Sequence, residues 1–150
     1  MTQTYEAMTI AKWFVAWADA NEAELSNLKL QKLLYYAQGL HLAANGEPLF
    51  PEAIQAWSHG PVVPVVYHAF KKFQSQDVEL SEDDDFEFSV VDDETTDFLI
   101  GVWNTYGGLA AWKLRDLTHE EPPWKENFKE DVRNVEIPVE SMKQFFASRI

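Results

Sequence analysis

Residues 25–46, LSNLKLQKLLYYAQGLHLAANG, constrain the fold most, because they predict a helix that is apolar on most of its sides. Ser26 or Asn27 is a suitable N-cap, and Gly46 ends the helix because glycine readily adopts the left-handed conformation. A helix of this kind is typical of the centre of a domain, with neighbours on several sides. Its broad apolar arc contains Leu30, Leu33, Leu34, Ala37 and Leu40. The opposite side carries the further apolar residues Leu28, Tyr35 and Leu42.

Further helices are predicted around this central one. Apolar residues at helical spacing mark 9–20, Pro64 opens another helix, Asp92 and Asp93 open a third that ends at Gly107, and two more cover 109–117 and the residues after Pro138. Alternation in 53–58 and 86–91 predicts two short strands that can pair, and 118–124 reads as a proline-containing loop. The expected fold is α+β and predominantly α: one compact helical domain over residues 1–150 with a small two- or three-stranded sheet.

Composition excludes several classes of protein. The 150 residues include no cysteine, so disulfides and thiolate chemistry are excluded, which fits a reducing cytoplasm. No signal peptide and no apolar run of about 18 residues is visible, so neither export nor a membrane partner is expected. A net charge of −13 opposes binding to a phosphate backbone, so nucleic acid ranks last among partners. Acidic residues favour a basic partner, or simply keep a ring-rich protein soluble.

Residues capable of catalysis form no recognisable set. The four histidines lack zinc-helix spacing, and neither a Gly-rich phosphate loop nor a G-x-S-x-G elbow occurs. Residues 82–85 are acidic but lack the spaced ligands of a calcium loop, so a solvated loop is expected. His41 is expected to be structural, whereas His59, before Gly60, either contacts a ligand or bonds to the local backbone. No cofactor and no metal are therefore predicted, and the chain is not expected to be an enzyme.

Two groups of residues suggest a binding surface instead. Lys29, Lys32 and Tyr36 share one sector of the central helix, where each amine either reaches water along its apolar stem or borders a groove beside residues 57–63. Trp124 follows two prolines, and it either covers the core or is an exposed anchor of the kind enriched in binding hot spots.

The chain resembles the Panacea domain family, which includes SocA-like and phage-associated GepA-like proteins. The strongest matches are LKLQKLLYY at 28–36 and AWSHGPV at 56–62, with a weaker one at LTHE, 117–120, together with Trp124. Residues 107–112 depart from the family pattern. The resemblance implies an antitoxin that binds a toxin directly, or an adaptor that delivers a toxin to a cellular protease, and it implies no catalysis.

The sequence therefore predicts a cytoplasmic, non-enzymatic antitoxin that neutralises a cognate protein toxin encoded nearby. A protease adaptor is the alternative within binding proteins, and a small hydrolase using His59 or His119 is the alternative from another class. The residues expected to contact the partner are Lys29, Lys32, Tyr36, Trp57, Ser58, His59, Gly60, Pro61, Val62, Thr118, His119, Glu120 and Trp124.

Overall fold

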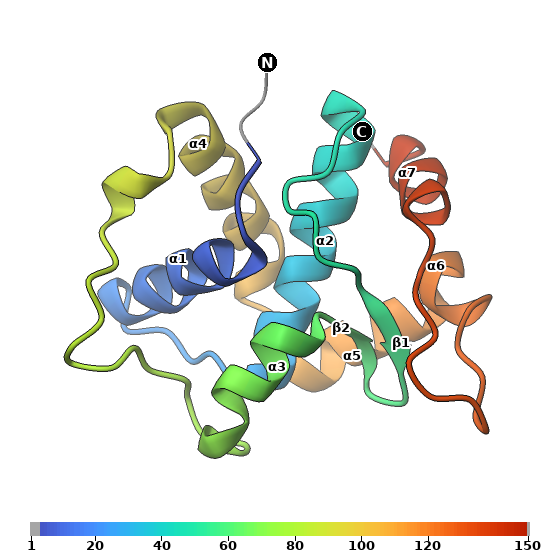
Figure 1. The fold of residues 1–150 in the computed structure, drawn as a ribbon, viewed down its shortest axis with the longest axis horizontal. Coiled ribbons are helices and arrows are strands. Elements are labelled where there is room, and N and C mark those ends of the chain that lie inside the picture. The colour runs from blue at the N-terminus through green and yellow to red at the C-terminus, as the bar shows by residue number, and fades with distance from the viewer. Residues whose placement is uncertain (1–3, 150) are drawn as a thin grey trace.

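A central helix, α2 (Asn27–Asn45), organises the fold in a computed structural model that describes residues 4–149. Figure 1 shows α1 (Ala7–Ala20) and α4 (Asp93–Val102) on one side of α2, and α6 (Pro122–Lys125) and α7 (Val139–Ala147) on the other. Helices α3 (Pro64–Phe70) and α5 (Ala111–Glu120) pack near the N-terminal end of α2. Every residue of α2 from Lys29 to Gly39 is buried, which confirms the prediction of a central helix.

Four of the predicted helix ends are also confirmed. The Ser26 side chain accepts a hydrogen bond from the Lys29 amide at 3.2 Å, and Gly46 closes α2 with a φ of 76°. Pro64 is the first residue of α3, and the Asp92 carboxylate caps α4 by accepting from the Thr95 amide at 2.7 Å. These signals act on backbone groups within one helical turn, so they can be recognised in the sequence without knowledge of the fold.

A small antiparallel sheet pairs β1 (Gln55–Trp57) with β2 (Gly60–Val62). A third segment extends it: the Ala56 amide donates to the Val135 carbonyl at 2.8 Å, and the Ile137 amide donates to the Ile54 carbonyl at 2.7 Å. The sheet thus confirms the predicted fold class, α+β and predominantly α.

The strand predicted at 86–91 is wrong. This segment contains only a single 3₁₀ turn, η2 (Phe88–Val90). The Phe88 ring packs edge-on against Trp13 and Trp17 of α1, with centroids 6.1 Å and 5.9 Å apart. The alternating rings therefore reflect packing on a helix rather than pairing with a strand.

Several helix boundaries also differ from those predicted. Helix α1 begins at Ala7, and α5 begins at Ala111 and continues to Glu120. The loop predicted at 118–124 is wrong, because all of it except Glu121 lies in α5 or α6. Pro122 then opens α6, because proline lacks only an amide that the first turn leaves unbonded. Short turns η1 (Lys71–Phe73) and the π-helical η3 (Trp103–Gly107) extend α3 and α4. Within residues 4–149, no helix is long and apolar enough to cross a membrane.

Candidate functional site

The turn between β1 and β2 lies directly on α2 and α5. Trp57 pairs with Gly60 across the hairpin, and Ser58 and His59 at its tip are exposed. Gly60 has a φ of 123°, a conformation that side-chain-bearing residues rarely adopt. A Cβ atom at this position would lie 3.2 Å from Thr118 Oγ1 and 3.3 Å from Lys32 Cε. Glycine therefore allows the turn to lie close to both helices.

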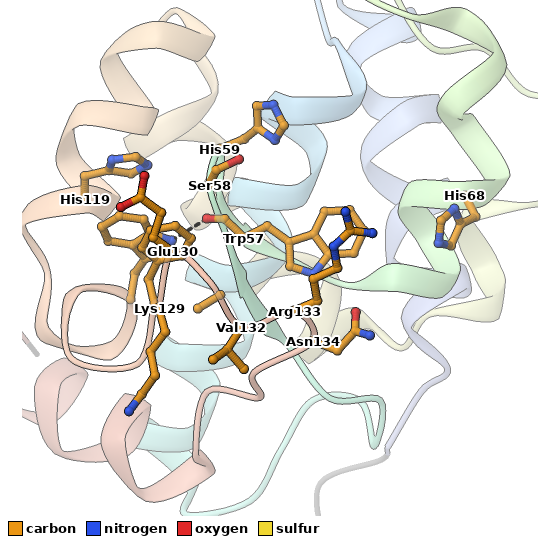
Figure 2. Close-up of a pocket in the computed structure, with 13 residues that line it drawn as sticks. Trp57, Ser58, His59, His68, His119, Lys129, Glu130, Val132, Arg133 and Asn134 are labelled. Atoms are coloured by element: carbon orange, nitrogen blue, oxygen red, sulfur yellow. Dashed lines mark hydrogen bonds between the residues drawn. The ribbon is translucent and has the colours of Figure 1, made fainter.

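An open pocket of about 700 Å³ is bordered by this turn, α3, α6 and the segment after α6 (Figure 2). The turn contributes Trp57, Ser58 and His59, and α3 contributes His68. His119 and Trp124 line the opposite side. The remaining lining residues are Ala56, Phe128, Lys129, Glu130, Val132, Arg133 and Asn134.

One wall of the pocket is a stack of three rings. The His119 imidazole lies 3.8 Å from the Trp124 ring at an interplanar angle of 12°, and Phe128 stacks on the far side of Trp124 at 4.7 Å and 11°. Trp124 is only 8% exposed, and its indole N–H donates to the Trp57 carbonyl at 2.7 Å. Trp124 therefore belongs to the core and holds the β-turn against α6.

His119 brings an unsatisfied nitrogen to this wall. Its Nε2 atom is buried and has no hydrogen-bond partner. Burial, and then the nearby charges of Arg115 and Lys32, hold the pKa of the imidazole below its usual value. Within residues 4–149, no hydrogen bond joins His59 or His119 to a carboxylate, and no group of three or more His, Asp and Glu residues is placed to hold a metal.

Two lysines of α2 are buried rather than solvated. Lys32 is 2% exposed, lies beneath Gly60, and donates to the Leu28 carbonyl at 3.3 Å. Burial lowers the pKa of Lys32 to about 8, and Arg115 contributes in the same direction. Lys29 donates to the carbonyls of Gly107 and Glu24, the latter at 3.4 Å, and burial also lowers its pKa.

The Glu121 carboxylate links α2 to the end of α5 through two hydrogen bonds. Tyr35 donates to Glu121 Oε1 and Tyr36 donates to Oε2, both at 3.0 Å, and Tyr36 stacks on Tyr106 with centroids 3.9 Å apart. Burial raises the pKa of Glu121, an effect that the two hydroxyl donors oppose. Sequence reasoning assigned no role to Glu121, because nothing local distinguishes it from Glu120, which is exposed.

The structure brings together only some of the predicted contact residues. Trp57, Ser58, His59 and His119 meet at the pocket, and Glu120 is exposed at the end of α5. Buried in the free chain are Lys29, Lys32, Tyr36, Gly60, Pro61, Val62, Thr118 and Trp124. Their direct contact with a partner stays a prediction. The sequence did not predict that His68 and residues of 128–134 line the pocket. The only available signal in 128–134 is its charged composition, which indicates an exposed segment and not its place in the fold.

Comparison with known proteins places the chain in a family. A family model described as antitoxin SocA-like, Panacea domain, matches residues 30–125, which include the β-turn, His68, His119 and Trp124 but not the pocket residues at 128–134. The chain belongs to this Panacea-domain family. A curated relative, antitoxin SocA of Caulobacter vibrioides (strain NA1000 / CB15N), is 44% identical over 68 residues, which are 45% of this chain and 36% of the relative.

The match thus spans about a third of the curated relative's length. No solved structure matches this Panacea-domain chain.

Proposed function

We propose that this Panacea-domain protein is a non-enzymatic antitoxin that neutralises a cognate protein toxin, encoded nearby, by binding it directly at the pocket. The observation that supports this most is the convergence of exposed and partly exposed residues from two distant segments of the matched region. Trp57, Ser58 and His59 meet His119 at one pocket, although about 60 positions separate them in the sequence. Accessible rings and polar groups in a single concave surface are typical of a binding site.

The pocket walls are held in place before a partner arrives. The bond from Trp124 to the Trp57 carbonyl fixes the turn to α6, and the ring stack supports Trp124 from both faces. A surface that is already ordered loses less conformational entropy on binding. Trp57 remains partly accessible, so it is available as an aromatic anchor.

The buried residues of the predicted set act as supports in this proposal. Lys32, Gly60 and Thr118 meet directly beneath the turn, and the Thr118 hydroxyl donates to the Arg115 carbonyl at 3.0 Å. Their positions explain why the turn adopts its conformation without requiring them to touch the toxin. Replacing them is therefore expected to alter binding through the shape of the turn.

The test is co-expression with the adjacent open reading frame, scored by growth rescue and by co-purification. Trp57→Ala is expected to weaken the complex by about 2 kcal/mol or more, at least about thirtyfold in affinity. Trp112→Ala is the matched control, because Trp112 is 67% exposed on α5 and does not line the pocket. It is expected to bind like the unmodified protein.

Two results would contradict direct neutralisation at this pocket. If Trp57→Ala is folded by circular dichroism and binds the toxin unchanged, the pocket is not the interface. If growth is rescued without a stable complex, and rescue disappears when a cellular protease is deleted, the protein is an adaptor rather than a direct inhibitor.

A further inference from the structure

We infer that the pocket receives an acidic segment of the partner protein, with carboxylates placed beside an aromatic or aliphatic side chain. This inference rests on the proposed function, since it describes the chemistry of the toxin surface that the pocket binds. The net charge of −13, taken over the whole molecule, would instead favour a basic partner.

The charge of the chain is unevenly distributed. Residues 77–97 carry eleven of the 25 acidic residues and no Lys or Arg. They run through the loop beside α1 and into α4, on the opposite side of α2 from α6 (Figure 1). Because exposed charges are screened within about 10 Å at moderate salt, this acidic segment contributes little to the potential at the pocket.

Among the charged residues that line the pocket, cations outnumber carboxylates by two to one, and Asp131 is a further exposed carboxylate on the same segment. Lys129 and Arg133 line it against a single carboxylate, Glu130, and within residues 4–149 neither cation is in an ion pair. Lys32 and Arg115 lie close enough behind His119 to lower its pKa, and Asp116 is the carboxylate that opposes them there. The free cations at the rim and the buried one behind the wall both favour an anionic ligand.

Several polar groups of the pocket can donate a hydrogen bond: Ser58, the imidazoles of His59 and His68, and Asn134. Figure 2 shows Arg133 near Trp57 and Asn134, whereas the Lys129 side chain extends away from them. These groups can all donate to an ionised carboxylate, and Lys129 and Arg133 disfavour a lysine or arginine from a partner. The partly exposed Trp57 ring and Phe128 add an apolar surface that a neighbouring ring or aliphatic chain can cover.

Histidine NMR signals provide a direct test, because three of the four histidines line the pocket and the fourth, His41, lies apart against Phe98. The probe is the acetylated and amidated peptide Asp-Glu-Phe-Asp-Glu-Phe, compared with its neutral counterpart Asn-Gln-Phe-Asn-Gln-Phe. The acidic peptide is expected to shift the ring signals of His59, His68 and His119 but not of His41. The neutral peptide is expected to bind at least about tenfold more weakly.

Charge reversal then tests the pocket cations. The double variant Lys129→Glu/Arg133→Glu is expected to weaken acidic-peptide binding about tenfold or more at 50 mM salt, and to remove most of its salt dependence. Lys71→Glu is the matched control, since Lys71 is an exposed lysine outside the pocket and should leave binding unchanged.

Several outcomes would overturn the inference. It fails if the two peptides bind equally, if the double variant binds the acidic peptide as before, or if ATP or inorganic phosphate shifts the same signals at lower concentration than the peptide. A toxin complex that Trp57→Ala disrupts but charge reversal leaves intact refutes this inference alone. If no toxin complex forms with the unmodified protein, the proposed function fails, whatever the peptides do.

Discussion

Replacing Lys32 by Met is expected to stabilise the fold. The ammonium group of Lys32 is buried beneath the Gly60 turn, with the Leu28 carbonyl as its hydrogen-bond acceptor and no ion pair within residues 4–149. Burying an uncompensated charge opposes folding, whereas Met has a similar length and no charge.

The magnitude follows from the pKa of Lys32, which falls from 10.5 to about 8. One pKa unit corresponds to about 1.4 kcal/mol, so burial of the charged amine opposes folding by roughly 3 kcal/mol at pH 7. Loss of the hydrogen bond to the Leu28 carbonyl lowers the unfolding free energy of the variant by about 1 kcal/mol. The net gain in unfolding free energy is therefore about 2 kcal/mol, a rise of about 4–8 °C in Tm for a chain of this size.

The pH dependence provides a sharper test than stability at one pH. Between the lowered pKa of about 8 and the unfolded value of 10.5, the unfolded state binds more protons than the folded state. The unmodified protein therefore becomes more stable as pH rises through this window, and the variant does not. Urea unfolding followed by circular dichroism measures the difference in unfolding free energy between Lys32→Met and the unmodified protein. This difference should fall by about 2 kcal/mol between pH 7.0 and pH 9.5.

The exposed Lys71 provides the control. Lys71→Met is expected to change stability by less than about 0.5 kcal/mol at both pH values. The reasoning is refuted if Lys32→Met is less stable than the unmodified protein at pH 7, or if the difference between them stays constant with pH. Toxin binding by Lys32→Met would then measure whether the lysine also affects the pocket.

Two further substitutions test the packing around α2. Glu121→Ala is expected to lower the unfolding free energy by about 2–4 kcal/mol, because two buried tyrosine hydroxyls lose their acceptor, and Glu121→Gln should lose less than half as much in the same urea titration. Since the pKa of Glu121 is raised, the folded state binds the extra proton, and the unmodified protein should gain stability relative to Glu121→Gln as pH falls through the raised pKa towards 4.5. Gly39→Ala should lower the unfolding free energy by about 1–3 kcal/mol, because the added Cβ would lie 2.1 Å from the Phe146 ring. The control, Gly101→Ala on α4, places its Cβ where no atom lies within 4 Å, so it should be neutral or stabilising. An equal effect of the two glycine substitutions would contradict the close packing of α2 on α7.

Local signals in the sequence were enough to predict much of the fold. The central position of α2 follows from apolar residues on most of its sides, and its ends follow from Ser26 and Gly46. The start of α3 at Pro64 and the cap of α4 at Asp92 are equally local. In each case the responsible residue acts on backbone groups a few positions away, so its effect does not depend on the rest of the chain.

The candidate site was predicted less completely for a physical reason. His59 was expected in a turn and lies at the exposed tip of the hairpin, but neither Lys129 nor Arg133 carries any local mark of its position at the pocket. Composition shows only that 125–134 is polar and charged.

The sequence by itself therefore determined most of the helices, four of their ends and the helix that becomes the centre. Tertiary structure alone decided that Glu121 bonds to two tyrosines, that 135–137 rather than 86–91 joins the sheet, and that Trp124 belongs to the core. Periodicity and capping depend on neighbours in the chain, whereas these pairings depend on which surfaces meet once the helices pack around α2.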